Sequence, residues 1–189
     1  MNRLQVIRHG RAASSWGDAD EDPGLDAVGH AQAAEVAAAI MALPEADRPT
    51  RVVSSPLRRC RETAAPLAQA LGVEMLVDPR VGEIPTPAGL SAADRPAWLR
   101  KAFEGAWEQI EGDLDYRAWA ESVAAALANY ANAAVFSHFV ALNAAVSVAT
   151  NEGRVAAFRP DHCSVTTFEV RDGRLILVDK GREAQSQVL

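Results

Sequence analysis

The chain has 189 residues, of which 49% are hydrophobic and 23% charged, a balance typical of a folded globular protein with a sizeable core. Its formal net charge of -6 argues against a nucleic-acid-binding protein, because contacts with a phosphate backbone require an excess of Lys and Arg on one face. Any site for an anion must therefore be local in this acidic chain.

No part of the sequence indicates export or membrane insertion. The first residues show no basic stretch followed by a long apolar one, so we expect no secretory signal and a cytoplasmic protein. The candidate membrane segment, residues 131–149, is rich in Ala but interrupted by Asn, Ser and His, which favours a buried strand and helix. Cys60 and Cys163 are interpreted as reduced thiols.

The first half of the chain alternates short apolar runs with segments typical of helices. Strands are predicted at residues 4–7, 51–54 and 73–77, and helices at residues 27–43 and 57–71. Asp26 is a suitable N-cap for the first helix, which is expected to stop before Pro44. Pro56 is expected in the first turn of the second helix, and Gly72 at its end.

The second half begins with two longer helical patterns. Helices are predicted at residues 92–110, 115–131 and 139–150, and strands at residues 134–137, 165–170 and 175–178. In the first of these helices, Trp98, Phe103 and Trp107 recur at near-helical spacing, which fits either core packing or the wall of a ligand site. Asp172-Gly173 between the last two strands is a strong signal for a β-hairpin.

Strands that alternate with helices imply a mainly parallel sheet covered on both faces, with antiparallel strands added at the end of the chain. We therefore predict an α/β fold, a three-layer αβα sandwich. The sequence contains no internal repeat or low-complexity linker, so residues 1–189 are expected to form one domain, with a helical insertion at about residues 91–131.

Several basic residues directly follow predicted strands, where ligands gather in such sheets. Arg8 and His9 follow the first strand, Arg59 lies one turn into the helix after the second, and His138 ends the fourth. Converging there, they would form a compact cationic pocket suited to a phosphoryl group, since each guanidinium offers paired donors to a tetrahedral oxyanion. Phosphate monoesters hydrolyse very slowly, so we expect covalent catalysis with protonation of the leaving group.

Five ordered stretches of the chain resemble the histidine phosphatase, or phosphoglycerate mutase-like, superfamily. They are Val6-Ile7-Arg8-His9-Gly10, Leu25 to Ala33, Ser54 to Ala64, Pro79 to Ile84 and Val135 to His138, with a weaker match at Cys163-Ser164-Val165. The order of the set makes it far more specific than an isolated Arg-His-Gly. The resemblance implies a phosphoglycerate mutase-like fold.

The resemblance also implies a mechanism. Neutral His9 would attack phosphorus and become phosphorylated, while Arg8, Arg59 and protonated His138 hold the non-bridging oxygens. Glu83 matches the acidic position and would protonate the leaving group, then take a proton from the attacking water. This chemistry requires no metal or cofactor, and the expected partner is a small phosphorylated metabolite, with no nucleic acid and no membrane.

Some positions depart from the family pattern. Phe139 stands where glycine usually follows the second histidine, and Arg11, Ala12 and Ala13 stand where the mutase branch has polar residues that help bind phosphate. These departures favour a phosphatase. Phosphoglycerate mutase-type phosphoryl transfer remains one alternative, and a catalytically decayed phosphate-ligand binding module is another. His162 is considered as a residue at the pocket edge, but a plain structural role is favoured.

Overall fold

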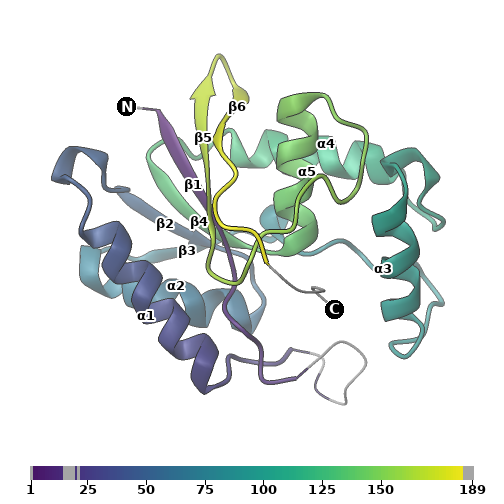
Figure 1. The fold of residues 1–189 in the computed structure, drawn as a ribbon, viewed down its shortest axis with the longest axis horizontal. Coiled ribbons are helices and arrows are strands. Elements are labelled where there is room, and N and C mark those ends of the chain that lie inside the picture. The colour runs from purple at the N-terminus through teal and green to yellow at the C-terminus, as the bar shows by residue number, and fades with distance from the viewer. Residues whose placement is uncertain (1, 15–19, 21, 185–189) are drawn as a thin grey trace.

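The computed structural model describes residues 2–14, 20 and 22–184. Among these residues, six strands form one sheet with helices on both faces (Figure 1). The strands are β1 (Arg3–Arg8), β2 (Arg51–Ser54), β3 (Met75–Val77), β4 (Ala133–Ser137), β5 (Val165–Arg171) and β6 (Arg174–Asp179). The α-helices are α1 (Ala27–Met41), α2 (Arg58–Leu71), α3 (Arg95–Glu104), α4 (Tyr116–Leu127) and α5 (Phe139–Thr150).

The strand order is β3-β2-β4-β1-β5-β6. β1 to β4 pair in parallel, β2 lying between β3 and β4, and β4 pairing with β1. β5 runs antiparallel to β1, and β6 runs antiparallel to β5. The predicted mainly parallel sheet with a terminal antiparallel addition is confirmed.

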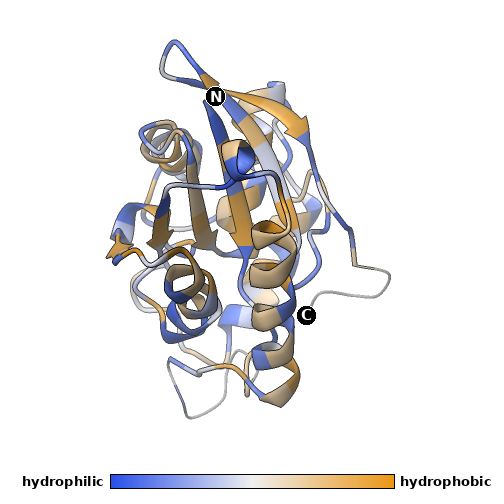
Figure 2. Ribbon diagram, turned by 90° about the vertical axis from the view of Figure 1, so that its left-hand side faces the viewer, coloured by the Kyte–Doolittle hydropathy of each residue, from blue (hydrophilic) through white to orange (hydrophobic). Residues whose placement is uncertain are grey.

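Two hydrophobic cores lie on opposite faces of the sheet. Successive side chains of a strand point to opposite faces, so Ile7 and Val52 join the core under α1 and α2. Val6 and Val53 join the other core, with α3, α4 and α5. Figure 1 shows the two groups of helices on either side of the sheet, and Figure 2 shows hydrophobic residues concentrated in the central strands. The three-layer αβα sandwich is therefore confirmed.

Several predicted signals at the ends of elements are present. The Asp26 carboxylate caps α1 by accepting a hydrogen bond from Gly29 N–H at 2.7 Å. Gly72 ends α2 in the left-handed conformation, with φ 66°. Asp172 and Gly173 have φ values of 51° and 70°, which is the backbone that a two-residue turn between β5 and β6 requires.

The predicted helix at residues 92–110 is too long. α3 ends before Gly105, which is extended, and a separate 3-10 turn begins at Trp107. Gly105 O accepts a hydrogen bond from Val155 N–H, and Trp107 N–H donates to Gly153 O, both at 3.1 Å. Pairing with a distant segment thus takes the backbone groups that would have continued the helix.

Two other helix boundaries also differ from the prediction. Pro56 lies outside α2, because Leu57 is extended, with ψ 139°, and acts as the N-cap of a helix that begins at Arg58. The helix predicted to reach residue 131 ends at Leu127, and Asn132, with φ 57°, then turns the chain into β4.

The most apolar stretch of the chain forms β4 and α5, as predicted. α5 is buried along most of its length. Its one amide side chain, Asn143, is also buried and donates from Nδ2 to Phe139 O, while Asn143 Oδ1 accepts from Phe158 N–H. Among the described residues, no helix combines the length and apolar character needed to cross a bilayer.

Candidate active site

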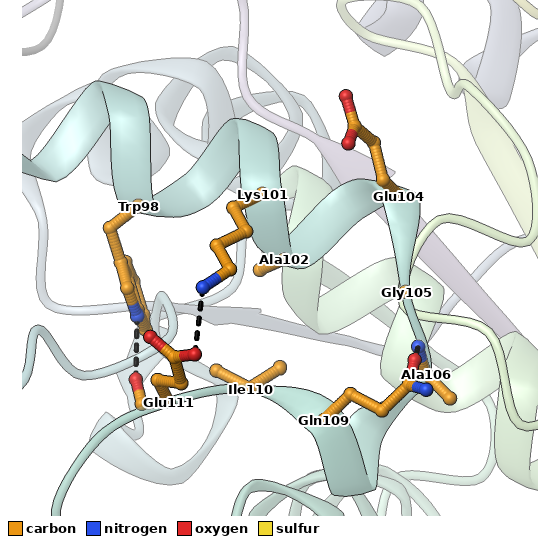
Figure 3. A pocket seen from close by; sticks show the side chains of 9 residues that line it. All are labelled: Trp98, Lys101, Ala102, Glu104, Gly105, Ala106, Gln109, Ile110 and Glu111. Carbon is orange, nitrogen blue, oxygen red and sulfur yellow. Dashed lines mark hydrogen bonds and ion pairs between the residues drawn. The ribbon is translucent and has the colours of Figure 1, made fainter.

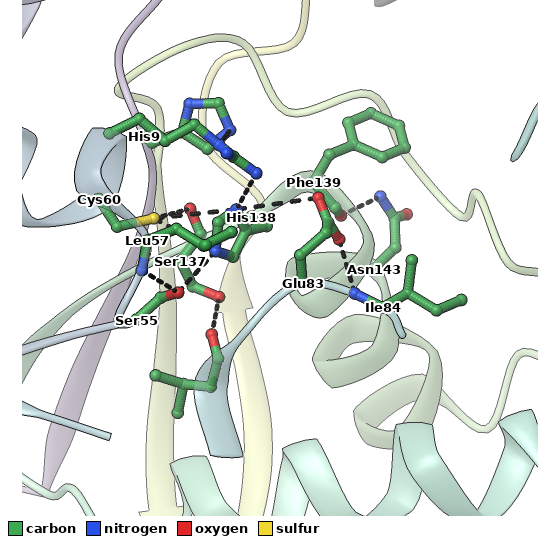
Figure 4. Close-up of polar contacts among 12 residues, drawn as sticks. His9, Ser55, Leu57, Cys60, Glu83, Ile84, Ser137, His138, Phe139 and Asn143 are labelled. Atoms are coloured by element: carbon green, nitrogen blue, oxygen red, sulfur yellow. Dashed lines mark hydrogen bonds and ion pairs between the residues drawn. The ribbon is translucent and has the colours of Figure 1, made fainter. Parts of the chain in front are cut away.

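Neighbouring elements bring the predicted basic residues to one edge of the sheet, and Figure 4 shows two of them, His9 and His138. Arg8 ends β1, His138 directly follows β4, and Arg59 lies in the first turn of α2 after β2. The carboxyl ends of these parallel strands meet because β2, β4 and β1 are adjacent. His9 N–H donates to Ser137 O at 3.0 Å, which joins the end of β4 to the loop after β1.

The His9 ring has a defined tautomer. Its Nδ1 lies 2.8 Å from Gly10 O, and because a carbonyl oxygen only accepts, Nδ1 carries the hydrogen. Arg59 Nε donates to His9 Nε2 at 3.3 Å, so Nε2 holds a lone pair. Burial lowers the pKa of His9 well below its usual value of 6.5, and the positive charges of Arg59 and Arg8 lower it further. His9 is therefore a neutral imidazole whose Nε2 is unprotonated.

Close backbone packing holds the loop that carries His9. Gly10 N–H donates to Thr63 Oγ1 at 3.0 Å. A Cβ atom added to Gly10 would lie 2.8 Å from Gly29 O, and one added to Gly29 would lie 2.1 Å from Arg11 O. Only glycine allows this approach between the loop after β1 and the first turn of α1. This close approach explains why glycine stands at position 10 in the first family-like stretch and at position 29 in the second.

Arg59 links the two predicted histidines. It is 4% exposed, and while its Nε reaches His9, its Nη2 donates to His138 Nδ1 at 3.3 Å. The centroids of the two imidazole rings are 5.3 Å apart. Because a guanidinium carries five N–H donors in a planar fork, Arg59 can also donate to the oxygens of an anion between these rings.

His138 is fully buried and contacts different groups on its two nitrogens. Nδ1 faces Arg59, whereas Nε2 lies 2.7 Å from Ser55 Oγ and 3.4 Å from Cys60 Sγ. Burial lowers the pKa of His138 well below its usual value of 6.5, and Arg59 lowers it further. The ligand-free ring is therefore neutral, whereas the family resemblance implied a protonated His138.

Glu83 lies in the loop after β3 and turns its carboxylate toward His138 (Figure 4). Oε1 accepts a hydrogen bond from Ile84 N–H at 3.0 Å, and Oε2 is 3.8 Å from His138 Nδ1. The side chain is only 5% exposed, and within the described part of the chain Oε2 is buried without a hydrogen-bond partner. A buried carboxylate oxygen in this state is available to exchange a proton with a ligand.

Arg8 completes the group of basic residues. Its Nη1 donates to Pro160 O at 2.9 Å, and its guanidinium lies 5.5 Å from the centre of the Phe139 ring. Burial lowers the pKa of Arg8 to about 10, and the charge of Glu83 opposes that shift. The Phe139 ring also lies 5.0 Å from that of Phe103 in α3. The bulky residue after His138 thus supports Arg8 and connects it to the α3 segment.

Four further residues lie at the site that the sequence analysis did not assign to it. Ser55 and Cys60 contact His138, as described. The His162 ring centroid is 6.0 Å from that of His9, so His162 does lie at the edge of the site, the reading that we had favoured less. Arg95, at the start of α3, lowers the pKa of His138 through its charge. Ser55 carried a usable signal, a polar side chain directly after a strand, and His162 was considered at the pocket edge from the sequence, whereas Cys60 and Arg95 carried none.

The aromatic residues of the α3 segment divide between core and surface. Trp107 is buried and donates from Nε1 to Ser147 Oγ at 2.9 Å. Trp98 lines an open hollow together with Lys101, which forms an ion pair with Glu111 at its rim (Figure 3). None of the five predicted site residues lines this hollow. It is therefore separate from the basic cluster.

Known proteins resemble this chain in sequence family and in fold. The family model described as the histidine phosphatase superfamily (branch 1) matches residues 4–182. No curated protein gave a significant sequence match. The fold is similar to that of a mycobacterial glucosyl-3-phosphoglycerate phosphatase, with 23% identity, a TM-score of 0.73, and coverage of 97% of this chain and 100% of that chain.

It is also similar to a phosphoserine phosphatase from Entamoeba histolytica solved in complex with 3-phosphoglyceric acid. That match has 21% identity, a TM-score of 0.76, and coverage of 98% of both chains. At these identities the likeness establishes a shared fold, whereas the family match rests on nearly the whole sequence. The chain therefore belongs to the histidine phosphatase superfamily, branch 1, and its enzyme class is that of a phosphatase.

Proposed function

We propose that the chain hydrolyses a small phosphomonoester without a metal ion, through a phosphohistidine formed on His9. The observation that carries this proposal is the hydrogen bond from His9 Nδ1–H to Gly10 O, because it leaves the lone pair of the neutral ring on Nε2. The lowered pKa of His9 supports the same assignment, since the nucleophilic form then persists at neutral pH.

Arg8, Arg59 and His138 are proposed to hold the non-bridging oxygens while phosphorus moves from the ester oxygen to His9 Nε2. Arg59 supports this role because its fork already spans both rings. For His138 to donate through Nδ1, that nitrogen must gain a proton. Two negative charges on a bound phosphate favour this protonation, so we propose that His138 is neutral before binding and cationic in the complex.

Glu83 is proposed to protonate the leaving oxygen and later to accept a proton from the water that attacks phosphohistidine. The burial of its carboxylate and the 3.8 Å separation between Oε2 and His138 Nδ1 support this role, because they put a proton carrier beside the oxyanion holder. The products are inorganic phosphate and an alcohol, and His9 is regenerated.

The proposed substrate is a small phosphorylated metabolite. One structural neighbour is named for glucosyl-3-phosphoglycerate, and the other is named for phosphoserine and was solved with 3-phosphoglyceric acid. Both names describe small phosphate monoesters. The α3 segment, which reaches the site through Arg95 and Phe103, is where we expect the leaving group to be selected.

Measuring phosphate release from p-nitrophenyl phosphate in the presence of EDTA, and then from a panel of phosphorylated metabolites, tests this function. The wild-type protein should release phosphate with EDTA present. His9→Ala should release none above background, while the control His30→Ala, which removes an exposed histidine, should match the wild type. Isomerisation of 3-phosphoglycerate without phosphate release would instead support a mutase. Calorimetric binding of phosphorylated ligands without turnover would support a decayed binding module.

A further inference from the structure

The proposed reaction uses only the Nδ1 side of His138, yet the Nε2 side is packed against polar side chains (Figure 4). Ser55 Oγ lies 2.7 Å from Nε2, and Cys60 Sγ lies 3.4 Å from it. Ser55 and Cys60 are both fully buried. Burying a hydroxyl costs free energy unless the hydroxyl is hydrogen-bonded. The position of the Ser55 hydroxyl beside a histidine of the site therefore points to a role in hydrogen bonding to that histidine.

The direction of these hydrogen bonds follows from the donors. The Arg59 guanidinium can only donate, so His138 Nδ1 accepts from it and the ring hydrogen lies on Nε2. Nε2–H then donates to Ser55 Oγ. The Cys60 thiol donates to Ser137 O at 3.4 Å, so its hydrogen points away from the ring. Ser55 Oγ is therefore the acceptor for Nε2–H.

We propose that Ser55 is a positioning residue whose hydroxyl holds the His138 ring with Nδ1 toward the phosphate and accepts the Nε2 hydrogen throughout the reaction. This inference rests on the proposed function, in which His138 Nδ1 donates to a non-bridging oxygen. In the ligand-free protein the neutral ring donates to Ser55 from Nε2. When Nδ1 gains a proton in the complex, Nε2–H still has the same partner.

The charged groups around His138 explain why the Ser55 hydroxyl is needed when the ring is protonated. The titratable and charged groups that face the ring are Arg59 and Cys60 from α2, Arg8 and His9 from the end of β1, Glu83 from the loop after β3, and Arg95 from α3. The three arginines oppose a positive charge on His138. Without the Ser55 oxygen, Nε2–H would keep only a weak acceptor, Cys60 Sγ at 3.4 Å, in both the neutral and the protonated ring.

The test compares Ser55→Ala with Ser54→Ala. Ser54 is equally buried, but its hydroxyl donates to Ser55 O and does not touch His138, so it is a matched control. In Ser55→Ala we expect kcat for phosphate release to fall about tenfold to a hundredfold, by analogy with the loss of a hydrogen-bond partner that orients a metal-bound histidine. KM should change less than kcat. Ser54→Ala should keep the wild-type kcat.

A spectroscopic readout separates positioning from general damage. In the ligand-free wild-type protein, the ¹⁵N resonances of the His138 ring should report hydrogen on Nε2 and none on Nδ1. Ser55→Ala should shift the Nε2 resonance, because the Nε2 hydrogen loses its Ser55 acceptor, and should shift the acid limb of the pH profile of kcat, while Ser54→Ala should do neither.

Wild-type ring resonances and wild-type kcat in Ser55→Ala would overturn the proposal, as would an equal loss in Ser54→Ala. If the wild-type protein releases no phosphate from any substrate, the proposed function fails. A shift of the His138 Nε2 resonance in Ser55→Ala would still support the positioning of the ring by Ser55 in that case.

Discussion

His9 and His138 carry the same side chain but present opposite nitrogens to the site. His9 is fixed through Nδ1 by Gly10 O and turns Nε2 toward Arg59, whereas His138 is fixed through Nε2 by Ser55 and turns Nδ1 toward Arg59. In each ring, one nitrogen contacts its own partner and the other nitrogen contacts Arg59. This difference in orientation underlies the proposed nucleophile and the proposed oxyanion holder.

Sequence reasoning could identify which of several neighbouring arginines serves the site, but only through the family resemblance. Arg58, Arg59 and Arg61 lie within four positions of each other. The structure buries Arg59 between the histidines, while Arg58 is exposed and pairs with Glu62. Periodicity alone could not choose among them, because the choice depends on which face of α2 meets the end of β4.

The proposed role of Glu83 makes a prediction that depends on the leaving group. Glu83→Gln keeps the shape of the side chain but removes its ability to exchange a proton. With an alkyl phosphate, kcat should fall about 10²- to 10⁴-fold, the usual contribution of a general acid. With p-nitrophenyl phosphate, whose leaving group needs little protonation, the loss should be much smaller. Steady-state kinetics on both substrates measures this contrast, and equal losses would refute the general-acid role.

At the scale of elements, the sequence predicted the ends of elements well where they depend on neighbouring residues. It did not predict an end that depends on pairing with a distant segment. The Asp26 cap, the Gly72 stop and the Asp172-Gly173 turn each depend on one or two residues, and all are present. The end of α3 depends instead on hydrogen bonds between Gly105 and Val155, fifty positions away. Periodicity contains no information about such a partner, which is why the predicted helix ran on to residue 110.

Contact between α1 and the loop after β1 leads to a prediction at Gly29. In Gly29→Ala the new Cβ would lie 2.1 Å from Arg11 O, so α1 or the loop carrying His9 must move. We expect a loss of about 1–3 kcal/mol in the free energy of unfolding, typical of overpacking, and a loss of activity.

Gly153→Ala is the matched control, because a Cβ at Gly153 meets nothing within 4 Å. Urea denaturation measures both variants. If Gly29→Ala were as stable and as active as Gly153→Ala, the close approach of α1 would not be what holds the His9 loop.

For the whole molecule, the sheet order accounts for the site. The segments that end in His9, Arg59 and His138 are remote in sequence, but β1, β4 and β2 are neighbours, so their carboxyl ends form one edge. The alternation of strands and helices predicted that edge, and the polar residues directly after each strand predicted the basic cluster. These patterns did not predict Arg95 and left the placing of His162 at the pocket edge as the less favoured reading, because the paths of α3 and of the loop before β5 are set by tertiary contacts.

Keeping two histidines neutral in the folded protein makes stability depend on pH. Burial lowers the pKa of His9 and His138 well below the ordinary value of 6.5 and lowers that of His162 to about 4. Below pH 6.5 the unfolded chain therefore binds protons that the folded chain does not bind. The free energy of unfolding should therefore decrease as pH falls below about 6.5, by about 1.4 kcal/mol per pH unit for each histidine.

Denaturation curves between pH 7.5 and 5 measure this slope. His9→Ala should reduce the slope, because it removes one of the histidines whose pKa burial lowers. His30→Ala, which removes an exposed histidine, is the control. A wild-type protein whose stability did not fall with pH would contradict the neutral state assigned to both rings.

The most direct test of the central claim is to trap the phosphorylated enzyme. Mixing the protein with a phosphomonoester, quenching with alkali within milliseconds and locating the phosphate by mass spectrometry should give an acid-labile, alkali-stable phosphohistidine at His9 in the wild-type protein. His9→Ala should give no such species. Phosphate release by a protein that never carries phosphate on His9, or a phosphorylated residue elsewhere, would contradict the account.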